Sequence, residues 1–235
     1  MTNYRQQIKT ELKNVATKQR AEASQRYFKT GPGEYAEGDM FIGATMQQQR
    51  EIAKRHKDMS LSSIQELLDS SVHEERMIGL VILTLQYPKA SEDKKEEIYY
   101  FYLRNSHRIN NWDLVDVTAP RIIGAYLVDK DKKVLIKLAQ SKLLWDRRIA
   151  ILSTMAFIDK HECEWTFKIA KMLLKDQEDL IHKAVGWMLR EVGKKCGEVV
   201  LMEFLDQYAC KMPRTMLRYA IEKFDPVVRQ KYLIA

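Results

Sequence analysis

Apolar residues recur at intervals of three and four along nearly the whole chain, and this spacing constrains the fold more than any other feature. Sustained two-residue alternation, the pattern of a half-buried strand, is absent. Nine Gly and five Pro in 235 residues are about half the usual share, which argues against the many turns of a β-sandwich or barrel. The sequence therefore predicts an all-α protein with short polar joints between its helices.

Helix boundaries follow from the spacing and from start signals, in which a hydroxyl and a side chain three residues later satisfy the first free amides. The pairs that fit this capping box are Thr45 with Gln48, Ser62 with Gln65, and Ser71 with Glu74. The predicted helices span 4–28, 45–57, 61–69, 72–86, 92–104, 112–127, 131–140, 146–158, 163–174, 179–194, 197–208, 213–223 and 226–233.

From about residue 60 the predicted helices pair into hairpins of roughly 30 to 40 residues, which is the repeat length of HEAT-like solenoids. The helix around Ile149 to Ile158 is apolar on all sides, as expected for the inner layer, whereas other helices have two distinct faces. The net charge of +7 favours a polyanionic partner. We expect one HEAT-like helical-repeat domain over residues 1–235, an α-α superhelix with a concave basic face.

Four of the nine glycines lie between Gly31 and Gly43, together with Pro32. This segment resembles a phosphate-binding loop at its start, but no strand precedes it and no Lys-Ser/Thr pair follows it, so neither nucleotide fingerprint is met. The segment is predicted to be a flexible connector between helices.

The sequence gives no sign of a metal or cofactor site. His161 and His73 each begin a run resembling a zincin helix, but neither run has the second histidine on the same face. The three cysteines lack the spacing of a metal or redox pair and are expected to be reduced thiols. No signal peptide or membrane-spanning run is recognisable, so we expect a soluble, cytoplasmic protein. We also expect it to be a monomer.

The predicted helix 179–194 has an apolar stripe and an unusual opposite face. Trp187 lies off the apolar stripe, and Lys183, Arg190 and Lys194 share its face at offsets of −4, +3 and +7. Such a face suits an anion that also offers a ring to stack on. The alternative is an indole buried against a neighbouring helix layer, surrounded by basic side chains that reach the solvent.

The predicted helix that begins at Trp112 carries two carboxylates. Asp113 lies in the first turn, where the helix dipole favours a carboxylate, so we expect it to need no functional explanation. Asp116 lies four residues after Trp112 on the same face, and Pro120 removes a backbone donor one turn later. Arg148 follows another arginine at a helix start, where cations need compensation by an acid or a bound phosphate.

Three of these blocks, in this order, resemble the DNA alkylation repair glycosylases of the AlkD type, which are built from HEAT-like repeats. The blocks are Trp-Asp-Leu-Val-Asp at 112–116 with the later Pro120, Arg-Ile-Ala-Ile-Leu at 148–152, and His-Lys-Ala-Val-Gly-Trp-Met-Leu-Arg-Glu at 182–191. The resemblance covers most of the chain.

The resemblance implies a catalytic role for Asp116, lesion contacts by Trp112 and Trp187, and a phosphate contact by Arg148. Tyr27 is similar to the third aromatic residue of the family. Further phosphate contacts are expected from the basic face of the 179–194 helix, formed by Lys183, Arg190 and Lys194.

The implied activity is excision of cationic N3- and N7-alkylated purines, of the 3-methyladenine and 7-methylguanine type, from duplex DNA. Such a base leaves as a neutral molecule without a general acid, so one carboxylate that stabilises the oxocarbenium-like transition state is sufficient. The resemblance also implies recognition through the duplex backbone, without a deep base pocket. Two alternatives remain, a noncatalytic DNA-structure binder and a HEAT-like protein-interaction scaffold.

Overall fold

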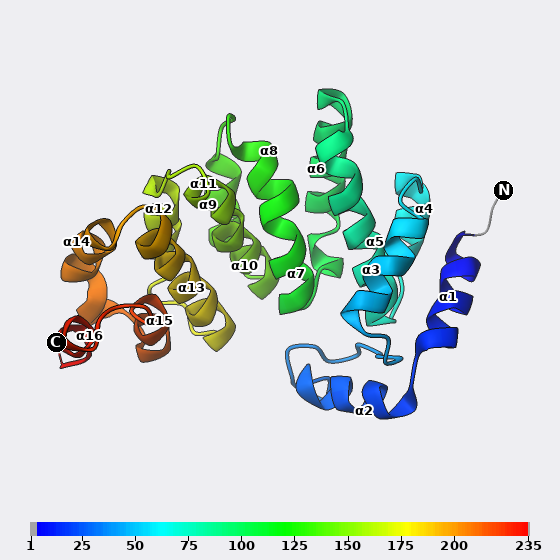
Figure 1. The fold of residues 1–235 in the computed structure, drawn as a ribbon, viewed down its shortest axis with the longest axis horizontal. Coiled ribbons are helices and arrows are strands. Elements are labelled where there is room, and N and C mark those ends of the chain that lie inside the picture. Colours follow the sequence, from blue (N-terminus) through cyan, green and yellow to red (C-terminus); the bar gives the residue numbers. More distant parts are fainter. Residues whose placement is uncertain (1–3, 235) are drawn as a thin grey trace. The chain divides into compact units, whose positions relative to one another are not determined.

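The structure, a computed structural model, describes residues 4–234, and these residues form helices joined by short segments (Figure 1). The described residues contain no strand, and the sole extended pairing among them is an isolated bridge between Met40 and Val72. Helical hairpins follow one another as in HEAT-like repeats, so the predicted all-α, HEAT-like fold is confirmed. The chain divides into two compact units, residues 1–118 and 119–235, which are described separately below.

The first unit is built around one helix that is buried along most of its length. Helix α5 packs against both α3 and α4, and its residues 73–83 are all buried. The first four of these are polar or charged, which requires internal partners for each of them. The helices of this unit are α1 (Tyr4–Val15), α2 (Lys18–Tyr27), α3 (Met46–Arg55), α4 (Leu61–Leu68), α5 (His73–Gln86), α6 (Glu92–Arg104) and α7 (Trp112–Ala119).

The largest error of the helix prediction lies at the N-terminus. The range 4–28 contains two helices, because the chain leaves the helical conformation before Thr17, whose side chain caps α2 by accepting from the Arg20 amide. Helix α2 has no buried residue, so the apolar spacing that marks the other helices is weak there. The Arg20 side chain holds the joint by donating to the carbonyls of Gly43 and Val15.

One of the three predicted capping boxes forms. Thr45 and Gln48 cap α3 reciprocally, as predicted. Helix α4 begins earlier than its predicted box, with Ser60 as the cap. Helix α5 begins later than its predicted box, with Val72 at the cap position, and it has no side-chain cap. The carboxylate of Glu74 binds backbone amides of another segment.

The second unit continues directly from α7. It begins with a π-helical turn, η3 (Pro120–Gly124), where Pro120 supplies no amide, and this is the irregularity expected from the sequence. The helices that follow are α8 (Ala125–Leu127), α9 (Lys133–Ala139), α10 (Leu144–Ser153), α11 (Met155–Ile158), α12 (Glu164–Met172), α13 (Asp179–Lys195), α14 (Glu198–Tyr208), α15 (Arg214–Ala220) and α16 (Pro226–Ile234).

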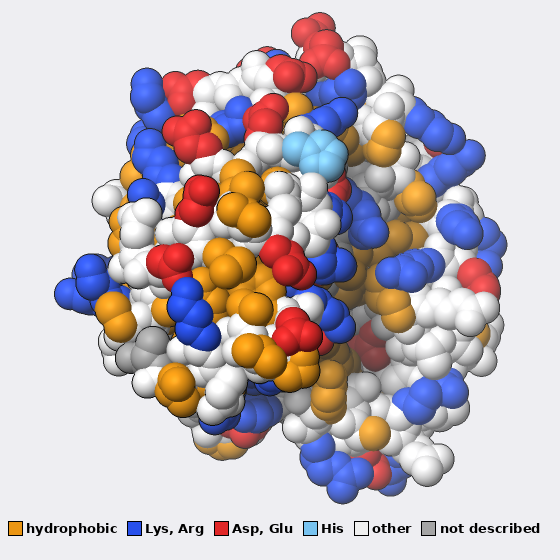
Figure 2. All heavy atoms as spheres, turned by 60° about the vertical axis from the view of Figure 1, so that its left-hand side comes forward, with side chains coloured by type: hydrophobic (Ala, Val, Ile, Leu, Met, Phe, Trp, Pro, Cys, Tyr) orange, Lys and Arg blue, Asp and Glu red, His pale blue; other side chains and the backbone are white. Residues whose placement is uncertain are grey.

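Two glycines allow helices of the second unit to pack at backbone distance. A Cβ on Gly186 would lie 2.4 Å from the carbonyl oxygen of Met216 in α15, and one on Gly124 would lie 2.3 Å from the carbonyl oxygen of Ser153 in α10. On the face shown in Figure 2, hydrophobic side chains reach the surface among acidic and basic ones. Val227 in α16 is 79% exposed.

Candidate functional site

The start of α7 brings together residues from the first unit that lie far apart in the sequence. Asn111 caps the helix by accepting from the Trp112 amide at 2.8 Å. The Trp112 indole donates to the Tyr35 hydroxyl at 3.3 Å and lies 6.0 Å from the ring of Tyr27 in an edge-to-face arrangement. Tyr27 is 66% exposed, so the structure places the first two predicted lesion-contacting aromatics side by side at the surface.

Trp112 is also one member of a group of stacked rings. Its indole stacks on Phe28, with ring centroids 5.2 Å apart and planes at 22°. Phe28 stacks in turn on Phe41 at 4.8 Å, and Phe41 stacks on the imidazole of His73 at 4.4 Å. Aromatic pairs contribute about 0.5 to 1.5 kcal/mol each beyond the area they bury, so these contacts restrict where the Trp112 indole can lie.

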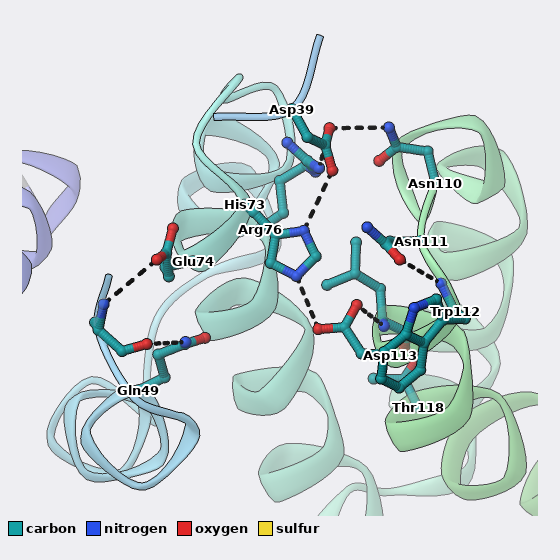
Figure 3. A network of polar contacts seen from close by, with 12 residues as sticks. Asp39, Gln49, His73, Glu74, Arg76, Asn110, Asn111, Trp112, Asp113 and Thr118 are labelled. Carbon is teal, nitrogen blue, oxygen red and sulfur yellow. Dashed lines mark hydrogen bonds and ion pairs between the residues drawn. The ribbon is translucent and has the colours of Figure 1, made fainter. Parts of the chain in front are cut away.

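A chain of charged groups runs beside the rings and ends in the first turn of α7 (Figure 3). The Nε2 atom of His73 lies 2.9 Å from a carboxylate oxygen of Asp113, and its Nδ1 atom lies 3.3 Å from one of Asp39. Asp39 also pairs with Arg76 at 2.7 Å and accepts a hydrogen bond from the side-chain amide of Asn110 at 3.1 Å. Since ionised carboxylates only accept hydrogen bonds, this arrangement fits an imidazolium, with a proton on each ring nitrogen of His73.

The pKa shifts agree with this geometry. Burial opposes the charged ring of His73, but the charge of Asp113 and hydrogen bonds to both carboxylates raise the pKa of His73 above its ordinary value. Burial likewise opposes ionisation of Asp39, but the hydrogen bond from His73 and the charges of Arg76 and His73 lower the pKa of Asp39. Both shifts favour the ion-paired state of His73 and Asp39.

The glycine-rich segment connects α2 to α3, as predicted, and its last part is anchored to this site by contacts that the sequence did not predict. The Glu74 carboxylate of α5 accepts from the amides of Ile42 and Gly43, at 3.1 and 2.8 Å. The same segment contributes two buried side chains, Asp39 and Phe41. Gly43 has a φ of +88°, and a Cβ there would lie 2.3 Å from the Thr17 carbonyl oxygen, so glycine is required.

Asp116 lies one turn after Trp112 on α7 and is half-buried. Burial raises the pKa of the neighbouring Tyr102, a hydrogen bond with Thr118 opposes this, and the negative charge of Asp116 raises it further. Tyr102 donates to the Thr118 hydroxyl at 2.8 Å, because that hydroxyl donates to the Leu114 carbonyl. The charge of Asp116 therefore influences Tyr102, a buried residue whose hydroxyl is held by hydrogen bonds through Thr118 to the Leu114 carbonyl.

A cavity of about 440 Å³ opens beside Trp112, although no deep pocket is expected from the sequence. Its polar lining is largely engaged within the protein: Asp113 pairs with His73, and Gln49 donates to the Ala44 carbonyl at 2.8 Å. Its lining residues are Arg20, Ala23, Ser24, Phe28, Phe41, Gly43, Ala44, Thr45, Met46, Gln49, His73, Met77, Trp112, Asp113 and Val117.

The other predicted site residues belong to the second unit, where α13 presents the expected face. Trp187 is half-buried, while the apolar stripe of α13 is buried throughout. The three cations around it are ion-paired. Lys183 pairs with Asp179 at 2.7 Å, Lys194 with Glu191 at 2.9 Å, and Arg190 with Glu222. Lys183 and Asp179 are both exposed, and such a pair contributes little to stability, so a phosphate can compete for Lys183. The Glu191 partner of Lys194 and the Arg190 side chain are largely buried.

Arg148 lies in a different environment from the one that its predicted role requires. It is 4% exposed and donates to the carbonyl of Leu180 in the first turn of α13. The adjacent Arg147 has the expected acidic partner, because Asp176 accepts from it at 2.6 and 3.3 Å. In the structure Arg148 therefore joins α10 to the start of α13.

Two residues make contacts that the sequence did not predict. Asp113 is more than a first-turn carboxylate, since it is the partner of a buried imidazolium. His73, considered in sequence only as a failed metal ligand, is 2% exposed and central to the site. The sequence does contain a signal for it, namely four consecutive polar residues, 73–76, entering a helix whose following residues are mostly apolar.

Within residues 4–234, three or more His, Cys, Asp or Glu side chains nowhere gather in a way that could hold a metal ion. Within the same residues, no helix has both the length and the apolar character needed to cross a membrane.

Comparison with known proteins identifies the family of this helical-repeat protein. The family model described as DNA alkylation repair enzyme matches residues 8–224, and the chain therefore belongs to this family. Comparison with the curated proteins gave no match. Among solved structures, the chain is similar to a predicted DNA alkylation repair enzyme from Enterococcus faecalis, with a TM-score of 0.71 and 14% identity over 90% of this chain and 97% of the other.

Proposed function

We propose that the protein is a DNA glycosylase that releases cationic N3- and N7-alkylated purines from duplex DNA. The observation that carries this proposal is the half-buried Asp116 carboxylate, one helical turn from Trp112, in a chain of the DNA alkylation repair family. The family itself supports a role in the repair of alkylated DNA, with DNA as the partner.

The chemistry matches a site with one such carboxylate. An alkylated purine with a formal positive charge departs as a neutral base, so bond breaking needs no proton donor. Positive charge then develops on the sugar, and a fixed carboxylate stabilises it electrostatically and orients the attacking water. In this proposal Asp116 has that role, while the exposed ring of Tyr27 and the indole of Trp112 contact the lesion nucleotide.

Residues of the second unit are proposed to bind the DNA. Trp187 offers a further ring, and Lys183, Arg190 and Lys194 exchange their acidic partners for backbone phosphates. For Arg148 the resemblance suggests a phosphate contact. Its burial instead supports an indirect contribution, through its bond to the first turn of α13.

The test is single-turnover release of 7-methylguanine from duplex DNA by wild type and by Asp116→Asn. The substitution preserves shape but removes the charge, so release should slow by roughly one to three orders of magnitude while affinity for undamaged duplex stays the same. Asp93→Asn, at an exposed first-turn carboxylate of α6, is the matched control and should be fully active. Full activity of Asp116→Asn would refute the catalytic role. Duplex binding without any base release by wild type would favour a noncatalytic DNA binder.

A further inference from the structure

His73 belongs to both systems that surround Trp112. Its ring stacks on Phe41, which stacks on Phe28, which in turn stacks on the Trp112 indole. Its Nε2 atom binds Asp113, the residue next to Trp112 in the chain. The indole is thus restrained through its side chain and through the backbone of the first turn of α7, and His73 takes part in both restraints. It comes from α5, whereas Trp112 begins α7.

A histidine is specifically suited to this position. A flat ring is needed to stack on Phe41, and two N–H donors on opposite sides are needed to bridge Asp39 and Asp113. A glutamine has the donors but neither the ring nor the charge. A lysine has the charge but cannot stack.

The charges around His73 balance only when it is protonated. Two carboxylates, those of Asp39 and Asp113, face the ring. Arg76 pairs with the Asp39 oxygen that does not bind the ring. The uncharged groups nearby are Asn110 and the rings of Phe28 and Phe41. With the imidazolium the group is neutral. After loss of one proton a ring nitrogen presents its lone pair to a carboxylate, and an uncompensated negative charge remains buried.

We propose that His73, as an imidazolium between Asp39 and Asp113, is the positioning residue that fixes Trp112 and the first turn of α7. In this role it sets where the indole lies and, one turn later, where Asp116 lies. The consequence for base release rests on the proposed function, whereas the consequence for Trp112 does not.

The first experiment observes Trp112 without any reaction. The ¹⁵N-indole signals of the full chain are recorded as a function of pH, and Trp112→Phe identifies the signal of interest. In wild type the Trp112 signal should move with a midpoint above the ordinary histidine pKa, and in His73→Gln this transition should vanish. A separate transition at higher pH, from the Tyr35 hydroxyl that accepts from the indole, should remain. His107→Gln, the same change at an exposed histidine, should keep the first transition. A Trp112 signal that lacks the first transition in wild type, or one that keeps it in His73→Gln, would overturn the proposal.

The second experiment measures single-turnover base release per folded molecule, with the folded fraction taken from circular dichroism. His73→Gln and Asp113→Asn should each lower the rate by about 10- to 100-fold, as expected for a displacement of about 1 Å at a reacting group. Their double variant should be no slower than the worse single variant, because both break one interaction. Rates that multiply would contradict a shared positioning role. If wild type releases no base, the proposed function fails, and the indole titration still decides the role of His73.

Discussion

Gly186 on α13 is a position where one added methyl group should force two helices apart. Its Cβ in Gly186→Ala would lie 2.4 Å from the Met216 carbonyl oxygen and 2.5 Å from the Tyr219 Cβ, both on or beside the backbone of α15. Ordinary contact begins at 3.4 Å, so α13 and α15 must separate by about 1 Å there. Neither contact can be relieved by rotation of a flexible side chain.

The magnitude follows from two opposing effects. Alanine is favoured over glycine inside a helix by about 1 kcal/mol, which stabilises the variant. Forcing a well-packed contact open costs about 1 to 3 kcal/mol, and more where backbone must move, so the upper end applies at Gly186. We expect Gly186→Ala to lower the free energy of unfolding by about 2 kcal/mol or more overall.

Gly79 in α5 is the matched control, because it is also a buried, mid-helix glycine. A Cβ there would lie 3.2 Å from the Leu67 Cβ and 3.4 Å from the Ile64 Cγ2, so a shift of a few tenths of an ångström suffices. Gly79→Ala should therefore leave stability nearly unchanged or slightly higher. Urea denaturation of both variants, followed by circular dichroism, measures the difference. Equal changes in the two variants would refute the argument that close backbone approach determines the cost.

Two further predictions concern pH and salt. The pKa of Asp39 is lowered, so its contribution to stability is present above the unfolded-state pKa and is lost as pH falls through the folded-state pKa. The pKa of His73 is raised, so its contribution is complete below the ordinary histidine pKa and is lost as pH rises through the folded-state pKa. Urea midpoints across the pH range should show both limbs. His73→Gln should lack the limb that begins near the ordinary histidine pKa, while the loss at higher pH, as buried groups such as Tyr102 ionise, should remain. If the first of these limbs is unchanged, His73 is not its source. In the second prediction, Lys183→Ala/Arg190→Ala should reduce the slope of log affinity for duplex DNA against log salt by about one for each phosphate that the variant no longer neutralises, and identical slopes would remove α13 from the interface.

Most of the helices could be predicted because each of them carries its own signal. The apolar stripe of α13 repeats at helical spacing over residues 179–195, and the structure buries that stripe while leaving Trp187 half-exposed. The break between α1 and α2 was missed because α2 buries no residue and so has no stripe whose end could be recognised.

The candidate site could be predicted only in part, because its key contacts join distant segments. Spacing along one helix is sufficient to pair Trp112 with Asp116. It contains no information that His73 binds Asp113, which lies 40 residues away in the sequence, or that Phe41 stacks on that imidazole. The contacts of the glycine-rich segment with Glu74 could not be predicted for the same reason. Glycines at positive φ allow tight turns as well as flexibility, and the buried carboxylate of Glu74 determines which of the two occurs here.

The two carboxylates of α7, Asp113 and Asp116, lie close together in the sequence but have different surroundings in the structure. Asp113 and Asp116 lie within one turn of each other, and the helix dipole favours a carboxylate at the earlier position regardless of function. Tertiary contacts separate them, because Asp113 faces the His73 imidazolium of α5, whereas Asp116 lies one turn after Trp112, whose indole contacts the exposed Tyr27. A variant at Asp113 is therefore no control for one at Asp116, since loss of the Asp113 charge leaves an imidazolium without one of its partners and disturbs the turn that precedes Asp116. A carboxylate that holds the helix start is a precondition for a second carboxylate to act from a fixed position.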